Sequence, residues 1–392
     1  MEALELLDLI QRGEDSRVQF KERVQDAHSI SQEMVALSNA EGGILIIGVD
    51  DRTGTLNGLN YHEIQRVNNL LVDAATNNVR PGIIIRTETI QVADQNVVVV
   101  YISPGMSKPY KDRNGVVWIK NGSDKRRVTS NEELARLLQT SRLLFADEML
   151  VQGTSLADIN LEHFGDFVKA KYHKTLAELN MDLGVLLRNL NLAKDGVLTL
   201  AGLLLFGANR QRYRPQYSLQ CVSVADIVIT GTDFLDNEPA FEGDLKAVFD
   251  QTITFIDRNL HKVPGGTSFN SPVVWEVPYE VFEELVVNAL IHRDYFVNTT
   301  IKVYIFSDRI EIISPGKLPN SLTVENIKNG ISIPRNPILQ SMAQYILPYK
   351  GLGTGISRAL AIYPEIEFVN SMETEQFKAI IKRPNVNGDG SD

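Results

Sequence analysis

The chain has 392 residues, more than one hydrophobic core usually holds, so two or three domains are expected. Hydrophobic residues make up 43% and charged residues 22%, which excludes a wholly disordered chain. The formal charge of −10 excludes a uniformly basic surface but permits a local basic patch. A single cysteine, Cys221, excludes an internal disulfide, and no Cys/His cluster has zinc-site spacing. With an acidic start and no long apolar run, the sequence predicts a soluble, cytoplasmic protein that does not enter a membrane.

The first 145 residues alternate between helical and strand patterns. Unbroken apolar runs at residues 44–49 and 97–102 predict two buried strands. A hairpin follows, with Asn-Gly turn signals at residues 114–115 and 121–122. Ser130 with Glu133 then predicts the capped start of a helix that runs to about residue 141. We place the first domain boundary near residue 145.

The remainder of the chain divides again near residue 271. Residues 146–271 predict a middle helical or connecting region, whose first part fits either a winged-helix-like unit or a connecting bundle. Residues 272–384 predict a third unit that mixes helices and strands, and we expect the polar tail at 385–392 to be disordered.

The strongest chemical signal lies in the phrase EVFEELVVNALIHRDY, which has the apolar periodicity of a helix. Glu284 and Asn288 are four residues apart, so both project from one side of it. A carboxylate and an amide at that spacing can hold a water molecule and a magnesium ion beside a phosphate chain. Further on, GLGTGI places Gly351, Gly353 and Gly355 before a helix, where bare N–H groups and the helix dipole attract phosphate.

Each of these signals is weak alone, because an E-x-x-x-N pair is usually a solvated face and a glycine-rich loop is usually a turn. A Walker A loop is absent, and no kinase glycine loop or D-F-G accompanies the triplet His292-Arg293-Asp294. We therefore expect that triplet to cap and brace the fold.

The order of the signals, together with VNALIHRDY, DRIEIISPGKLP, SIPRNP and GLGTGI, resembles the GHKL ATPase superfamily. It is most similar to the divergent, HATPase-like branch found in bacterial RecG-related ATP-binding proteins that are predicted transcriptional regulators. The resemblance implies ATP and Mg²⁺ as cofactors, Glu284 as general base, Asn288 as magnesium ligand, and Gly351, Gly353 and Gly355 around the triphosphate. In the superfamily an aspartate that binds adenine begins the glycine turn, whereas here Ser314 takes that place, followed by Gly316.

The phrases GEDSRVQFKE, ALSNAEGGILIIGVDD and VWIKNGSDKRRVTS resemble the Schlafen-type AlbA domain over about residues 5–142. In nuclease members of that family, two glutamates and an aspartate gather as a metal-binding cluster. The matching positions here are Glu14, Gln19 and one of Asp50 and Asp51. Because the Gln19 amide carries no charge, a nucleic-acid-binding domain without nuclease activity is favoured.

A basic hairpin supports contact with a polyanion. Residues 108–127 contain seven Lys and Arg against two Asp, and Lys120, Lys125, Arg126 and Arg127 are the predicted phosphate contacts. Trp118 either stacks on bases or packs in the core.

The expected fold class is α+β, with a Schlafen-type AlbA α+β domain over 1–145, a helical middle region, and a GHKL-like α/β sandwich over 272–384. The expected function is that of an ATP-binding, nucleic-acid-binding regulatory protein, for which the resemblance implies transcription regulation or antiviral defence. An ATP-gated, metal-dependent Schlafen-type endonuclease or endoribonuclease is one alternative, and an assembly platform without ligands is another. The nucleic acid is either DNA or RNA, and we expect a homo-oligomer.

Overall fold

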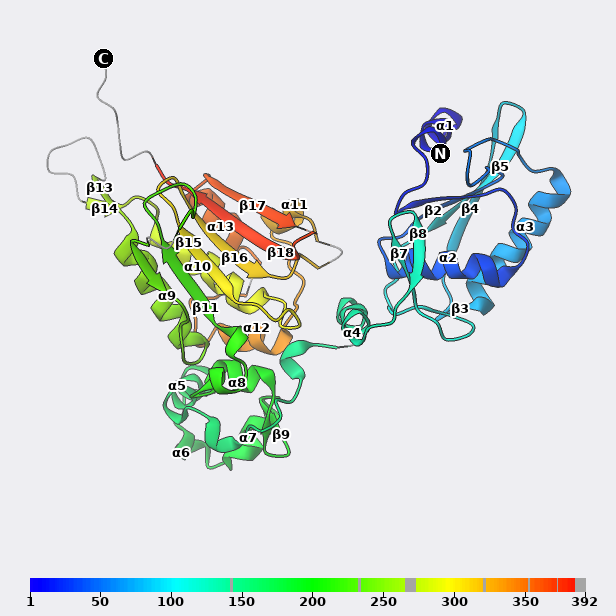
Figure 1. Cartoon of the computed structure of the whole chain (residues 1–392). Coiled ribbons are helices and arrows are strands. Elements are labelled where there is room, and N and C mark those ends of the chain that lie inside the picture. The colour runs from blue at the N-terminus through cyan, green and yellow to red at the C-terminus, as the bar shows by residue number, and fades with distance from the viewer. Residues whose placement is uncertain are drawn as a thin grey trace, which may run out of the picture. The chain divides into compact units, whose positions relative to one another are not determined.

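The computed structural model describes residues 1–141, 144–231, 234–264, 273–319, 322–351, 353–371 and 373–384. The tail expected to be disordered lies outside these residues. The chain forms two compact units, Met1–Leu144 and Phe145–Asp392 (Figure 1). Each unit combines helices with a mixed or antiparallel sheet, which confirms the α+β fold class.

The first unit is built on a four-stranded sheet with the order β1-β2-β5-β4. Its strands are β1 (Val18–Lys21), β2 (Gly43–Ile47), β4 (Ile85–Val92) and β5 (Gln95–Ile102), with β1 and β2 parallel and the other pairs antiparallel. Because successive side chains of a strand point to opposite faces, β2 and β5 supply two cores. Leu45 and Val100 pack with α2 (Ala27–Asn39) and α3 (Tyr61–Asp73), whereas Ile46 and Val99 pack with Leu6 of α1 (Ala3–Arg12). β2 and β5 are the two buried strands that the sequence predicted.

Short elements complete the first unit. A π-helical turn, Ala74–Asn78, follows α3; β3 (Val79–Arg80) pairs with β6 (Lys111–Asp112), and β7 (Trp118–Asn121) pairs with β8 (Asp124–Arg127). Gly122 turns the β7–β8 hairpin with a φ of 63°. The last helix, α4 (Asn131–Thr140), begins where the hydroxyl of Ser130 accepts the N–H of Glu133 at 3.1 Å, which confirms the predicted cap.

The second unit begins with a helical part. It contains α5 (Leu161–Tyr172), α6 (Leu176–Leu179), α7 (Leu183–Asn189), the hairpin β9 (Ala193–Lys194) and β10 (Val197–Leu198), α8 (Leu200–Phe206), and 3₁₀ turns at Ala146–Glu148, Leu156–Asp158, Arg210–Arg212 and Pro215–Tyr217. Every residue of α8 is buried. Gly202 makes this possible, because a Cβ atom there would lie 2.1 Å from the carbonyl oxygen of Leu192.

A six-stranded sheet, in the order β12-β11-β15-β16-β18-β17, dominates the second unit. The strands are β11 (Leu219–Ser223), β12 (Asp236–Glu238), β15 (Ile301–Ile305), β16 (Arg309–Pro315), β17 (Ile366–Ser371) and β18 (Gln376–Lys382). Only the β11–β15 pair is parallel. β11 and β12 thus come from the stretch in which the sequence predicted a helical or connecting region.

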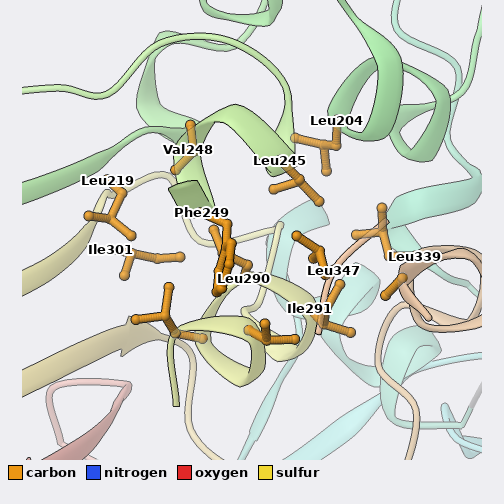
Figure 2. Packing of buried hydrophobic residues seen from close by; sticks show 14 of the residues in the cluster. Leu204, Leu219, Leu245, Val248, Phe249, Leu290, Ile291, Ile301, Leu339 and Leu347 are labelled. Carbon is orange, nitrogen blue, oxygen red and sulfur yellow. The ribbon is translucent and has the colours of Figure 1, made fainter. Parts of the chain in front are cut away.

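Helices pack against this sheet and against one another. α9 (Leu245–Asn259) contacts β11, α10 (Tyr279–His292) contacts β16, and α10 packs against both α9 and α13 (Gly355–Ile362). Figure 2 shows Leu219 of β11, Phe249 of α9, Leu290 of α10 and Ile301 of β15 converging in one core. The remaining elements are α11 (Val324–Lys328), α12 (Pro337–Ala343) and the pair β13 (Lys262–Pro264) and β14 (Val273–Trp275). Among the described residues, no helix has both the length and the hydropathy to cross a bilayer.

Candidate functional site

Helix α10 carries the predicted carboxylate–amide pair. Its apolar residues, including Val281, Phe282 and Val286, are buried in the core, which fixes the orientation of the helix. The side-chain Nδ2 of Asn288 donates to Oε1 of Glu284 at 2.8 Å, and Glu284 is only 9% exposed. In the described part of the chain no donor reaches the amide oxygen Oδ1 of Asn288, so this oxygen is free to bind a cation.

The glycine-rich loop meets this pair. Gly351 and Gly353 have φ values of 66° and 72°, which a residue with a side chain rarely adopts. Gly355 begins α13 against Glu284, so closely that a Cβ atom would lie 1.6 Å from Oε1. The N–H groups of the first turn of α13, which have no partner within the helix, therefore face the same site as Glu284 and Asn288.

These residues line one pocket that is open to solvent. One part of the wall is apolar and contains Ile312, Leu318, Ile327, Ile333, Phe368 and Phe377. The polar part contains four basic side chains, Lys317, Arg335, Lys350 and Arg358. Among its described lining residues, Glu284 is the sole carboxylate. The pocket therefore suits a ligand with an apolar, planar part and several negative charges.

The end of α10 is braced by buried basic groups. Burial and the charge of Arg335 lower the pKa of His292 to about 4, so its imidazole is neutral near pH 7. Arg335 donates to the carbonyl oxygens of His292 at 3.2 Å and Lys317 at 2.6 Å. Arg293 is buried between the rings of Tyr217 and Tyr295, with its guanidinium carbon 4.9 and 5.0 Å from their centroids. These contacts are those of a structural brace, as expected for this triplet.

Ser314 and Gly316 also line the pocket, at the end of β16. The hydroxyl of Ser314 donates to the carbonyl oxygen of Ala289 at 3.3 Å, so this end of the pocket offers a hydroxyl and not a carboxylate. Gly316 has a φ of 94°, and a Cβ atom there would lie 2.3 Å from Cβ of Asp294. The glycine is therefore needed for the chain to turn against the end of α10.

The carboxylates predicted for a nuclease site in the first unit have separate local partners. Glu14 accepts from the Gln19 side chain and from the N–H of Phe20, and Asp51 lies 3.7 Å from the ammonium of Lys21. Asp50 accepts hydrogen bonds within its own turn. The one from the backbone N–H of Thr53 contributes most to lowering the pKa of Asp50. In the described part of the chain, no three His, Cys, Asp or Glu side chains are placed to hold a metal ion.

The cations of the β7–β8 hairpin are also largely paired. Lys120 donates to Oε1 of Gln19 at 2.5 Å, and burial lowers the pKa of Lys120 despite the nearby Glu33 and Glu14. Lys125 donates to the buried Glu33 at 2.6 Å, and Arg126 forms a two-point pair with Glu133.

Arg127 differs from the other three predicted phosphate contacts. Its guanidinium carbon lies 5.1 Å from the centroid of the Trp118 ring, and no carboxylate within the described residues pairs with it. Trp118 packs against the core under α2 and donates Nε1–H to Asp112 at 2.9 Å. Trp118 is therefore partly buried against the core, and among the four predicted phosphate contacts Arg127 is the cation best placed for an external phosphate.

Sequence reasoning missed the basic side of the C-terminal pocket. Lys317 lies more than thirty residues before Lys350 and Arg358 in the chain, and only the fold brings it to the same pocket. The available signal was local: Lys317 directly follows Gly316, Lys350 precedes Gly351, and Arg358 lies one turn after Gly355. Cations beside glycine turns are typical of anion sites.

Comparisons with known families agree with this architecture. Residues 14–129 match the family model described as Schlafen, AlbA_2. Residues 298–381 match the family model HATPase_c_4, described as "Putative ATP-dependent DNA helicase recG C-terminal". The chain therefore carries a Schlafen AlbA_2 domain at its N-terminus and a RecG-type HATPase-like domain at its C-terminus, which confirms both resemblances. The second match begins after α10, so it contains Ser314, Gly316 and the glycine loop but not Glu284 or Asn288.

Solved structures include two similar chains. The DIP2311 protein from Corynebacterium diphtheriae is 19% identical with a TM-score of 0.48, over 97% of this chain and 80% of that chain. The N-terminal domain of a RecG-related protein from Nitrosomonas europaea is 24% identical with a TM-score of 0.24, over 33% of this chain and 96% of that chain. No curated protein matches the chain.

Proposed function

We propose that the chain is an ATP-binding, nucleic-acid-binding regulatory protein whose C-terminal pocket takes ATP with Mg²⁺. The observation that carries the proposal is the meeting of Glu284, Asn288 and the start of α13 in a pocket with four basic side chains. The HATPase_c_4 match over the adjoining sheet supports the same ligand class.

The pocket residues have separate roles in binding the nucleotide. Lys317, Lys350 and the N–H groups of α13 bind the phosphates, and the apolar wall receives the base. The free amide oxygen of Asn288 is a hard ligand that suits Mg²⁺, which when bound neutralises phosphate charge. Glu284 lies beside this position and accepts a proton from the attacking water. Ser314 and Gly316 contact the base end of the nucleotide.

The N-terminal unit supplies the nucleic-acid-binding function. Its support is the AlbA_2 match together with Arg127, which holds its charge on the surface of the hairpin. Nucleotide state controls nucleic-acid affinity, and by linkage nucleic acid changes ATP affinity by the same factor. Such coupling would serve transcription regulation or antiviral defence. No contact of Glu14, Asp50 or Asp51 favours the nuclease alternative. The homo-oligomeric state stays a prediction.

Isothermal calorimetry of ATP, with and without Mg²⁺, tests the nucleotide site. Asn288→Ala should abolish the part of the affinity that depends on Mg²⁺, whereas Glu284→Ala should keep binding and suppress hydrolysis. Asn237→Ala, on the exposed face of β12, is the matched control and should leave both properties unchanged. If the wild-type protein binds neither ATP nor any other nucleoside triphosphate, the site assignment is wrong.

A further inference from the structure

The carboxylate of Glu284 has a cationic partner within its own pocket. NH2 of Arg358 lies 3.0 Å from its Oε2, while Asn288 donates to its Oε1 at 2.8 Å. Both oxygens are therefore occupied by side chains of the pocket itself. Arg358 reaches Glu284 from α13, the helix whose first turn faces the position assigned to the phosphates.

Arg358 differs from the neighbouring Arg335 in its freedom to move. The guanidinium of Arg335 is half-buried and is fixed by its bonds to two backbone carbonyl oxygens. The side chain of Arg358 is 44% exposed, against 11% for Glu284, and Glu284 is its one recorded partner within the described residues. Because solvent reaches the guanidinium of Arg358, an incoming phosphate, which carries more negative charge than a carboxylate, can compete with Glu284 for it.

We propose that Arg358 recognises the terminal phosphate of the nucleotide by exchanging Glu284 for that phosphate as its partner. This inference rests on the proposed function, since Glu284 must lie beside the terminal phosphate to serve as general base. A guanidinium that touches Glu284 is then within reach of the same phosphate, which it can bind through two parallel N–H bonds. The pocket would thereby select triphosphates over diphosphates, because ADP has no group at the position where the exchange occurs.

The direct test compares affinities for a non-hydrolysable ATP analogue and for ADP, both with Mg²⁺. Arg358→Ala should weaken the ATP analogue about tenfold and ADP by less than about threefold, because a charge-assisted bond is lost only with the triphosphate. Arg258→Ala is the matched control: that arginine is 43% exposed and pairs with Asp236 and Glu238, outside the pocket. Its two affinities should equal those of the wild type.

A double-mutant cycle tests the exchange itself. Glu284→Gln removes the ion pair and also the repulsion between Glu284 and phosphate, so the ATP analogue should bind more tightly. This gain in affinity from Glu284→Gln should be several-fold larger when Arg358 is present than in the Arg358→Ala background. The reason is that the ion pair, which nucleotide binding must break, exists only when Arg358 is present. A residue that merely stabilised α13 would give the same gain in both backgrounds.

The outcomes separate the two proposals. Absence of nucleotide binding by the wild-type protein refutes the proposed function, and the exchange with it. Wild-type ATP binding, combined with equal losses for ATP analogue and ADP in Arg358→Ala, refutes the exchange alone. If thermal unfolding shows that Arg358→Ala does not fold, Arg358→Gln keeps a polar side chain without the charge, and the same comparison decides.

Discussion

Gly355→Ala tests the closest contact of the pocket. The added methyl carbon would lie 1.6 Å from Oε1 of Glu284 and 2.0 Å from its Cδ, whereas ordinary contact begins at 3.4 Å. Either Glu284 or the start of α13 must therefore move by about 1.8 Å. Overpacking of this kind costs at most about 1–3 kcal/mol, since the obstructing atoms are the end of the Glu284 side chain, which can rotate if its bonds to Asn288 and Arg358 break. In a unit of about 250 residues this corresponds to a fall in melting temperature of roughly 2–12 °C.

Differential scanning calorimetry and ATP titration measure the two consequences. ATP affinity should fall to the extent that the start of α13 moves, because its N–H groups bind the phosphates in the proposed site, whereas displacement of Glu284 alone should keep binding. Glu284→Ala in the same chain removes the obstructing carboxylate, so the double variant should regain most of the lost stability. Gly165→Ala, in α5, is the matched control, because its nearest foreign atom would lie 3.8 Å away. Unchanged stability in Gly355→Ala, or no recovery in the double variant, would refute the assigned packing.

Two other regions give predictions of their own. Replacing Arg126 and Arg127 with alanine should weaken nucleic-acid binding for all sequences and flatten its salt dependence by about one to two units, measured by fluorescence anisotropy; an unchanged slope would move the binding surface elsewhere. Burial raises the pKa of Asp147 to about 6, so the folded protein holds this proton more tightly than the unfolded chain. Stability should consequently fall as pH rises from about 4 through 6, by up to about 3 kcal/mol. In urea unfolding, the Asp147→Asn variant should not show this fall in stability with rising pH. If the variant and the wild type have the same dependence of stability on pH, the assignment to Asp147 is wrong.

Local patterns in the sequence predicted helix α10, which carries Glu284 and Asn288, and the turn of the glycine-rich loop. Glu284 and Asn288 share a helix, so their spacing alone places them side by side, and the helix is the observed α10. The start of a helix at Gly355 follows from the same local rule. Both signals depend on residues within one or two turns of one another, which a single sequence displays directly.

Contacts between distant residues were not predictable in this way. β11 has only five residues, and its place in the sheet depends on pairing Leu219 with Ile301, far along the chain. The sequence predicted that the hairpin cations face solvent, but Lys125 pairs with the buried Glu33. Glu33 lies on a different element, α2. Nothing in the local pattern distinguishes a lysine that faces solvent from one that reaches a carboxylate across the fold.

The six-stranded sheet of the second unit combines strands from both sides of α10 in the chain, and this restricts which gene segments can encode the unit. Residues 298–381 contain four strands, β15 to β18, but β11 and β12 precede them in the chain, and so does α10 with Glu284 and Asn288. A gene segment that encoded only those residues would leave Ile301 without its parallel neighbour and the glycine loop without its carboxylate. Recombination between genes could therefore exchange the second unit as a functioning module only if the segment began before β11.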